Sequence, residues 1–127
     1  MRFLLLACAV NGFLAVALGA FGAHGLTARL QAAADGAQRL EWWGTAAHYH
    51  LAHALALGLA AWAAGQLPGA LPRVAGWCFL AGILLFSGSL YAMTLTGFRG
   101  LGAVTPLGGL GFLAGWVCLG LAAWRAA

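Results

Sequence analysis

Four long apolar runs alternate with shorter, more polar segments along the chain. The runs cover residues 3–23, 43–64, 74–95 and 105–124, and none of them contains an arginine, aspartate or glutamate. Each exceeds the roughly 18 residues that a helix needs to cross about 30 Å of hydrocarbon. The pattern predicts a single all-α domain over residues 1–127, an integral membrane four-helix bundle.

The connections between the runs differ in character. Residues 25–42 hold two arginines, both acidic residues of the chain and two glutamines, with leucines among alanines. This composition predicts a short amphipathic helix lying in the membrane interface between helices one and two. Pro68, Gly69 and Pro72 predict a tight turn between helices two and three. Thr105 followed by Pro106 predicts the N-cap and first residue of the last helix.

Small residues and tryptophans predict how the helices pack and where they lie. Small residues recur at helical spacing on the first run and on the last: Gly12, Ala15, Gly19 and Gly22, then Gly108, Gly111 and Gly115. Such faces let backbones approach closely, within the bundle or between copies of the chain. Tryptophans lie near the ends of the runs, at Trp42, Trp43, Trp62, Trp77 and Trp124. We expect them to anchor the helices at the membrane surfaces.

Composition narrows the classes of partner. The chain is 64% hydrophobic and 6% charged, whereas about 25% of residues in soluble domains are charged. Its net charge of +4 comes from six scattered arginines against two acids, so neither a nucleic-acid site nor a polybasic lipid site is indicated. The three cysteines lack the spacing of a metal or redox motif. We expect the lipid bilayer as partner, and no nucleic acid.

Arginines divide equally between the two predicted membrane faces. Four spans place both termini on one side, with Arg2, Arg73 and Arg125. Three other arginines lie on the opposite side, so the positive-inside rule does not decide by number. The free amine beside Arg2 and the short loop at Arg73 favour a cytoplasmic location for both termini, in the inner membrane of a bacterium.

Most polar residues of the runs fall at one predicted face of the membrane, where helices one and three end and helices two and four begin. They are His24, His48, Tyr49, His50, His53, Ser87, Ser89, Tyr91, Thr94 and Thr105. Spacings of three or four place Tyr49, His50 and His53 on one face of helix two. A shared polar pocket is therefore one candidate site.

Two interpretations of this polar face remain open. In one, the side chains hydrogen-bond across helices, because a polar group in hydrocarbon needs a partner. In the other, the imidazoles hold a metal or haem iron, with His24 and His53 the candidate ligands, or histidine and tyrosine bind a quinone or lipid headgroup. The cluster contains no carboxylate, and the chain has no serine–histidine–acid set or phosphate loop. We therefore expect neither an enzyme nor a bound cofactor.

Four ordered motifs resemble a known family. They are the segment from Gly19 to Leu26, Tyr49 with His53-Ala54-Leu55, the segment from Phe86 to Tyr91, and Thr105 to Gly109 with Gly115-Trp116. Together they resemble the YgdD-like "domain of unknown function 423" membrane proteins, related to animal transmembrane protein 256. The resemblance implies a small multi-pass inner-membrane protein without an established activity. Only His24 and His53 among the histidines fall within the resembling motifs.

Three functions follow from these observations. The first is a non-enzymatic accessory protein whose His/Tyr/Ser-lined polar face binds a lipid or a membrane-protein partner. The second is a metal-, haem- or quinone-binding membrane protein. The third is a small channel or transporter, which would require a homo-oligomer because four helices are few to line a path. The sequence favours the first.

Overall fold

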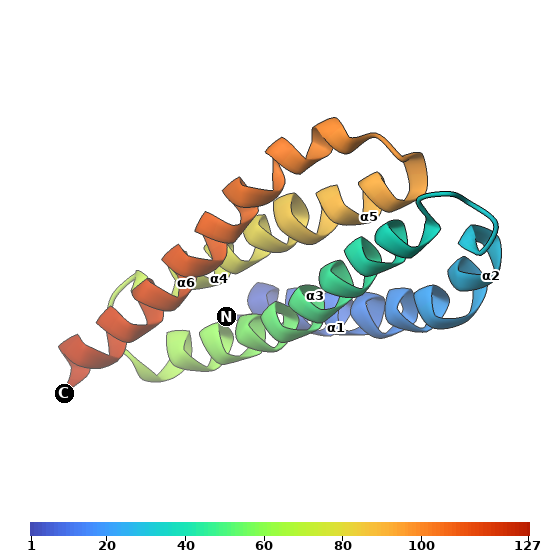
Figure 1. The fold of residues 1–127 in the computed structure, drawn as a ribbon. Helices are drawn as coiled ribbons and strands as arrows, with labels where there is room; N and C mark the ends of the chain where they lie inside the picture. Colours follow the sequence, from blue (N-terminus) through green and yellow to red (C-terminus); the bar gives the residue numbers. More distant parts are fainter.

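The computed structural model describes all of residues 1–127 and contains helices but no strands. Its elements are α1 (Arg2–Phe21), η1 (Gly22–Leu26), α2 (Thr27–Leu30), α3 (Gly36–Gln66), α4 (Leu71–Gly82), η2 (Ile83–Ser87), α5 (Gly88–Thr96), η3 (Arg99–Ala103) and α6 (Thr105–Ala126). The segments η1 and η2 are π-helical turns that continue one helix into the next, and η3 is a 3₁₀ turn. The chain thus forms four long helical rods (Figure 1).

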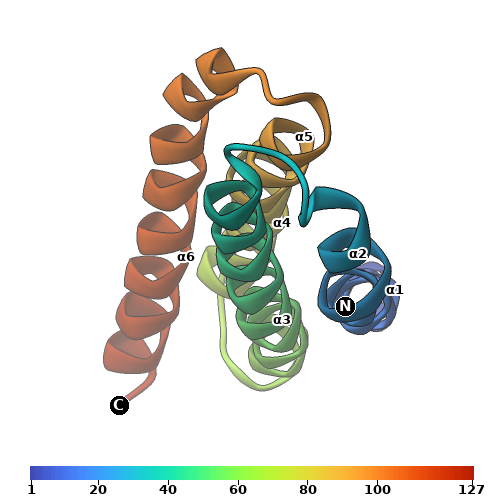
Figure 2. The ribbon, with the colours of Figure 1, turned by 45° about the vertical axis from the view of Figure 1, so that its right-hand side comes forward.

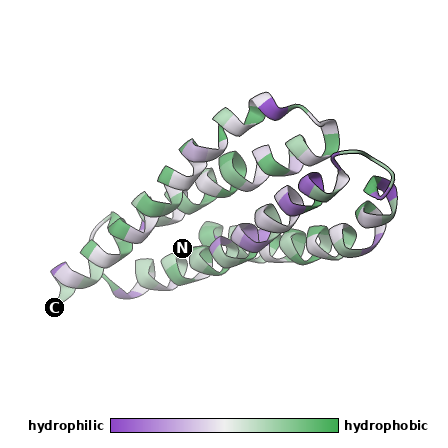
Figure 3. Ribbon diagram, in the orientation of Figure 1, coloured by the Kyte–Doolittle hydropathy of each residue, from purple (hydrophilic) through white to green (hydrophobic).

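Three of the four rods are long and apolar enough to cross a membrane by length and composition. They are Arg2–Leu30, Leu71–Thr96 and Arg99–Ala126. The fourth, α3, has 31 residues but carries His48, His50 and His53. Figure 3 shows hydrophilic residues along α3 between more hydrophobic neighbours. The all-α prediction is therefore confirmed, with three rods that meet the criteria for a span.

The predicted separate amphipathic helix between the first two rods is absent. Residues up to Leu30 continue the first rod, and α3 already begins at Gly36. Leu26 and Leu30, two of the leucines in the segment whose composition predicted the interfacial helix, pack instead against Trp43. Burying this apolar face against α3 removes the reason for a helix lying in the interface.

The rods are arranged around a central pair. The helix α3 packs between α1 and the α4–α5 rod, while α6 packs against α4 and η2 on the far side of that rod. Figure 2 shows α1 and α6 at opposite sides of the molecule. Both termini lie away from the α2–α3 connection (Figure 1). The largest core cluster includes Leu4, Leu57 and Phe79, from α1, α3 and α4.

The small residues on the last rod pack as the spacing predicted. A Cβ at Gly108 would overlap the backbone of Phe86, and one at Gly115 would lie 2.5 Å from the ring of Phe79. On the first rod the prediction is only half confirmed. Gly22 contacts Trp43, but Gly12 and Gly19 face open space.

One predicted surface anchor lies in the interior. Trp43 is only 3% exposed, and its indole nitrogen donates to the carbonyl oxygen of Leu18 at 2.7 Å. The small side of Gly22 admits this ring between α1 and α3. By contrast, Trp62, Trp77 and Trp124 are exposed, as anchors should be.

Candidate functional site

His50 links three rods through both of its ring nitrogens. Its Nδ1 lies 3.0 Å from the hydroxyl of Tyr91 on α5, and its Nε2 lies 3.1 Å from Oδ1 of Asn11 on α1. The Asn11 amide nitrogen donates to the carbonyl of Ala7, which identifies Oδ1 as the acceptor. His50 therefore donates from Nε2 and accepts the Tyr91 hydroxyl at Nδ1, as a neutral imidazole with both nitrogens satisfied.

His53 is satisfied in the same way but by different partners. The Trp116 indole donates to Nε2 of His53 at 3.2 Å, so Nδ1 carries the proton and donates to the Tyr49 carbonyl at 2.8 Å. The imidazole stacks on the ring of Phe112, with ring centres 3.5 Å apart. His53 thus connects α3 to α6.

The serine and threonine hydroxyls also join neighbouring rods. Buried Ser87 donates to the carbonyl of Ala46 on α3 at 2.9 Å. Ser89 donates to the carbonyl of Phe86 and meets the Thr105 hydroxyl at 2.6 Å. Thr105 makes no capping hydrogen bond to a helix amide, so its predicted role as N-cap is replaced by a bond to α5.

The histidines do not converge on one pocket. His50 faces α1 and α5, His53 faces α6, and His24 and His48 are exposed. No three histidine, cysteine, aspartate or glutamate side chains come together as metal ligands. The predicted polar face therefore consists of separate contacts between helices, spread around α3.

An open hollow lies on the α6 side of α3, beside His53. Its volume is about 470 Å³, and it is lined by Tyr49, His53, Phe86, Pro106, Gly109, Leu110, Phe112, Leu113 and Trp116. Tyr49 and Trp116 are 41% and 46% exposed at its wall. The volume and the mostly aromatic lining fit the range typical of small-molecule sites.

Tyr49 is the one polar side chain of this hollow with an unused hydrogen-bonding group. Its backbone carbonyl accepts from His53, while its hydroxyl has no partner in the chain. Its ring is nearly parallel to those of His53 and Phe112, with interplanar angles of 5° and 12°. The hollow therefore combines flat apolar walls with one free hydroxyl.

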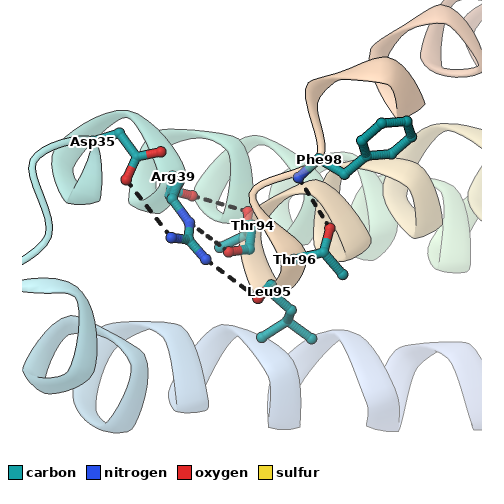
Figure 4. Close-up of polar contacts among 6 residues, drawn as sticks. All are labelled: Asp35, Arg39, Thr94, Leu95, Thr96 and Phe98. Atoms are coloured by element: carbon teal, nitrogen blue, oxygen red, sulfur yellow. Dashed lines mark hydrogen bonds and ion pairs between the residues drawn. The ribbon is translucent and has the colours of Figure 1, made fainter.

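A polar contact that the sequence did not predict joins the start of α3 to the end of α5, near the α2–α3 connection. The Arg39 guanidinium donates to the carbonyls of Thr94 and Leu95, at 2.8 and 3.2 Å, and lies 3.6 Å from Asp35 (Figure 4). The Thr94 hydroxyl lies 2.9 Å from the Arg39 carbonyl. Arg39 thus satisfies carbonyls that the end of α5 leaves without helical partners. Only the position of an arginine near a span end hinted at this role.

Comparison with known proteins identifies relatives over nearly the whole chain. A family model described as "Protein of unknown function (DUF423)" matches residues 18–109. The UPF0382 membrane protein YwdK of Bacillus subtilis (strain 168) is 44% identical over 97% of each chain. The UPF0382 inner membrane protein YgdD of Escherichia coli (strain K12) is 44% identical over 93% of this chain and 86% of its own.

A UPF0382 membrane protein of Staphylococcus aureus (strain bovine RF122 / ET3-1) is 38% identical over 98% of each chain. No solved structure matches. The matching family model, the relatives named as membrane proteins and the three rods able to cross a bilayer agree with the resemblance found in the motifs. The chain therefore belongs to the DUF423 family and is a multi-pass protein of the bacterial inner membrane.

Proposed function

We propose that this chain is a non-enzymatic membrane protein that binds a lipid-soluble molecule in the hollow between α3 and α6. The observation that carries the proposal is the contrast between this hollow and the remaining polar interior. The hollow has room and a free hydroxyl at Tyr49. Elsewhere the buried polar side chains bond to other side chains or to backbone carbonyls, and no buried side-chain nitrogen or oxygen lacks a partner.

The same pairing supports a role without catalysis. A general acid, base or metal ligand needs a nitrogen or oxygen that can reach a substrate or ion. Both ring nitrogens of His50 and of His53 are already hydrogen-bonded. Three of these four hydrogen bonds join α3 to another helix, and the fourth, from Nδ1 of His53 to the Tyr49 carbonyl, lies within α3. Hydrogen bonds between helices are a common use of polar groups inside a membrane.

A four-span topology places the hollow within the bilayer. The 31 residues of α3 give a length of roughly 46 Å at 1.5 Å per residue, more than the hydrocarbon requires. The buried His50 and His53 of α3 have hydrogen-bond partners, which lowers the cost of placing them in lipid. His53 then lies near mid-depth, and the exposed Leu110 and Leu113 place one edge of the hollow against lipid.

Four spans put both termini on one side of the membrane, and the free amine beside Arg2 and the short loop at Arg73 favour the cytoplasm for that side. A homo-oligomer or a partner protein could then contact the outer faces of α1 and α6. A reporter active only in the cytoplasm, fused after Ala127, should be active, and one inserted near Asp35 should be silent. The opposite pair of results would show that both termini lie outside the cytoplasm.

The lipid-binding proposal is tested by lipid retention after detergent washing. A Cβ at Gly109 meets only Phe86, at 3.9 Å, so a Gly109→Leu side chain would extend into the hollow. Gly120→Leu on the same helix is the matched control, because Gly120 faces open space away from the hollow. Extraction and mass spectrometry should find lipid in the wild type and Gly120→Leu, and a several-fold loss in Gly109→Leu. Equal lipid in all three proteins would refute the proposal.

A further inference from the structure

The residues that line the hollow between α3 and α6 favour one chemical class of ligand. This inference rests on the proposed function. We propose that the hollow takes an uncharged planar ring bearing a carbonyl oxygen, the head of an isoprenoid quinone, with that oxygen accepting a hydrogen bond from Tyr49. The proposal concerns binding alone.

Charge is the first constraint on the ligand. None of the residues that line the hollow is an arginine, lysine, aspartate or glutamate. A phosphate or carboxylate headgroup would enter a low-dielectric site without a counter-charge, at a high desolvation cost. The occupant is therefore neutral, which separates it from the headgroups of anionic phospholipids.

Shape is the second constraint. Five of the lining residues have flat rings: Tyr49, His53, Phe86, Phe112 and Trp116. The rings of Tyr49, His53 and Phe112 share nearly one orientation, and Trp116 meets His53 at 65°. His53 and Phe112 cover each other's facing surfaces, so a flat ring would pack against the half-exposed rings of Tyr49 and Trp116. A flexible acyl chain gains less from this arrangement than a planar ring does.

Hydrogen bonding is the third constraint. The Trp116 indole hydrogen is used on His53, and both His53 nitrogens are occupied. Only the Tyr49 hydroxyl remains to recognise a ligand by hydrogen bonding. A phenolic hydroxyl donates readily to a carbonyl oxygen, and a ring with such an oxygen matches the single free donor. The side opening provides room for an isoprenoid tail among the surrounding lipids.

The test measures binding of decylubiquinone, a quinone with a short alkyl tail, to the full chain in phosphatidylcholine nanodiscs. Wild type and Gly120→Leu should bind it equally, and Gly109→Leu should abolish binding. Tyr49→Phe keeps the ring and should weaken binding about five- to tenfold, the effect of losing one hydrogen bond. Tyr91→Phe removes the other tyrosine hydroxyl, outside the hollow, and should leave binding unchanged.

A second probe separates this inference from the proposed function. Decylcyclohexane has the same ten-carbon tail on a smaller six-membered ring that is neither planar nor oxygen-bearing. If it competes with the quinone on equal terms, or if Tyr49→Phe binds as the wild type does, the planar-carbonyl assignment is wrong while lipid binding stands. If the quinone does not bind, but Gly109→Leu still loses co-purified lipid, the same conclusion holds. If Gly109→Leu changes neither measurement, both proposals fall.

Discussion

His50 and His53 of α3 lie in different surroundings. On one side, His50 is enclosed by α1 and α5 and bonds to side chains on both. On the other, three residues further on, His53 bonds to its own helix and to Trp116, beside an open hollow. Both imidazoles have two partners, but only His53 itself lines a hollow. A second hollow, of about 350 Å³, lies on the α1 side, and it is lined by Asn11 and five apolar residues but not by His50. A polar residue inside a membrane bundle is therefore best judged by the space beside it.

The largest expected effect on stability comes from a substitution at Gly108, where the backbone of α6 lies against the backbone of Phe86. Gly108→Ala should destabilise the protein by about 3 kcal/mol, because the new methyl group overlaps the backbone of Phe86 and α6 must move away. Gly109→Ala is the neighbouring control, since its methyl group meets only the Phe86 ring at 3.9 Å. Unfolding in graded denaturing detergent should separate the two variants. Similar midpoints would show that α6 is not held by this contact.

Replacing each histidine with phenylalanine should show that His50 contributes more to stability than His53. His50→Phe should cost about 1.5 kcal/mol, towards the upper end for hydrogen bonds between membrane helices, because it leaves the Tyr91 hydroxyl and the Oδ1 of Asn11 without a partner. His53→Phe should cost about 0.5 kcal/mol, since Trp116 loses one acceptor at a partly exposed site. The same unfolding assay measures both. A greater loss for His53→Phe would reverse the comparison.

The two tyrosines should show the smallest effects. Tyr91→Phe removes a hydroxyl that His50 accepts and should cost about 0.6 kcal/mol, the average for hydrogen bonds between membrane helices. Tyr49→Phe removes a hydroxyl without a partner in the chain, so stability should not change. A double-mutant cycle of Tyr91→Phe with His50→Phe should give a coupling energy near the single Tyr91 effect. Simple additivity would mean that the two side chains do not interact.

Much of the architecture follows from the sequence because apolar length and glycine spacing are local properties. The apolar runs predicted the long rods, and the glycines of the last run predicted the approach of α6 to α4 and η2. The prediction of an interfacial helix after Gly25 was wrong, because the leucines that favour a membrane-facing helix equally favour packing on Trp43. Local composition does not choose between these two apolar partners.

The sequence predicted less of the candidate site than of the fold. Spacing placed His50 and His53 on one face of α3, but the neighbouring helices divide that face between α1 with α5 and α6. The shared pocket that the spacing made one candidate is divided into two separate contacts. The use of Arg39 at the end of α5 depends on a tertiary contact between residues 55 positions apart. No pattern within either segment indicates that contact.

The central claim is that the polar contacts of His50 hold the helices together while the hollow beside His53 binds a ligand. Native mass spectrometry from gentle detergent tests it most directly, because one spectrum reports subunit count and retained mass. The account predicts an added lipid mass on the wild type and on His50→Phe, and its loss in Gly109→Leu. Loss of that mass in His50→Phe, with retention in Gly109→Leu, would contradict the account and move the binding site to the other side of α3.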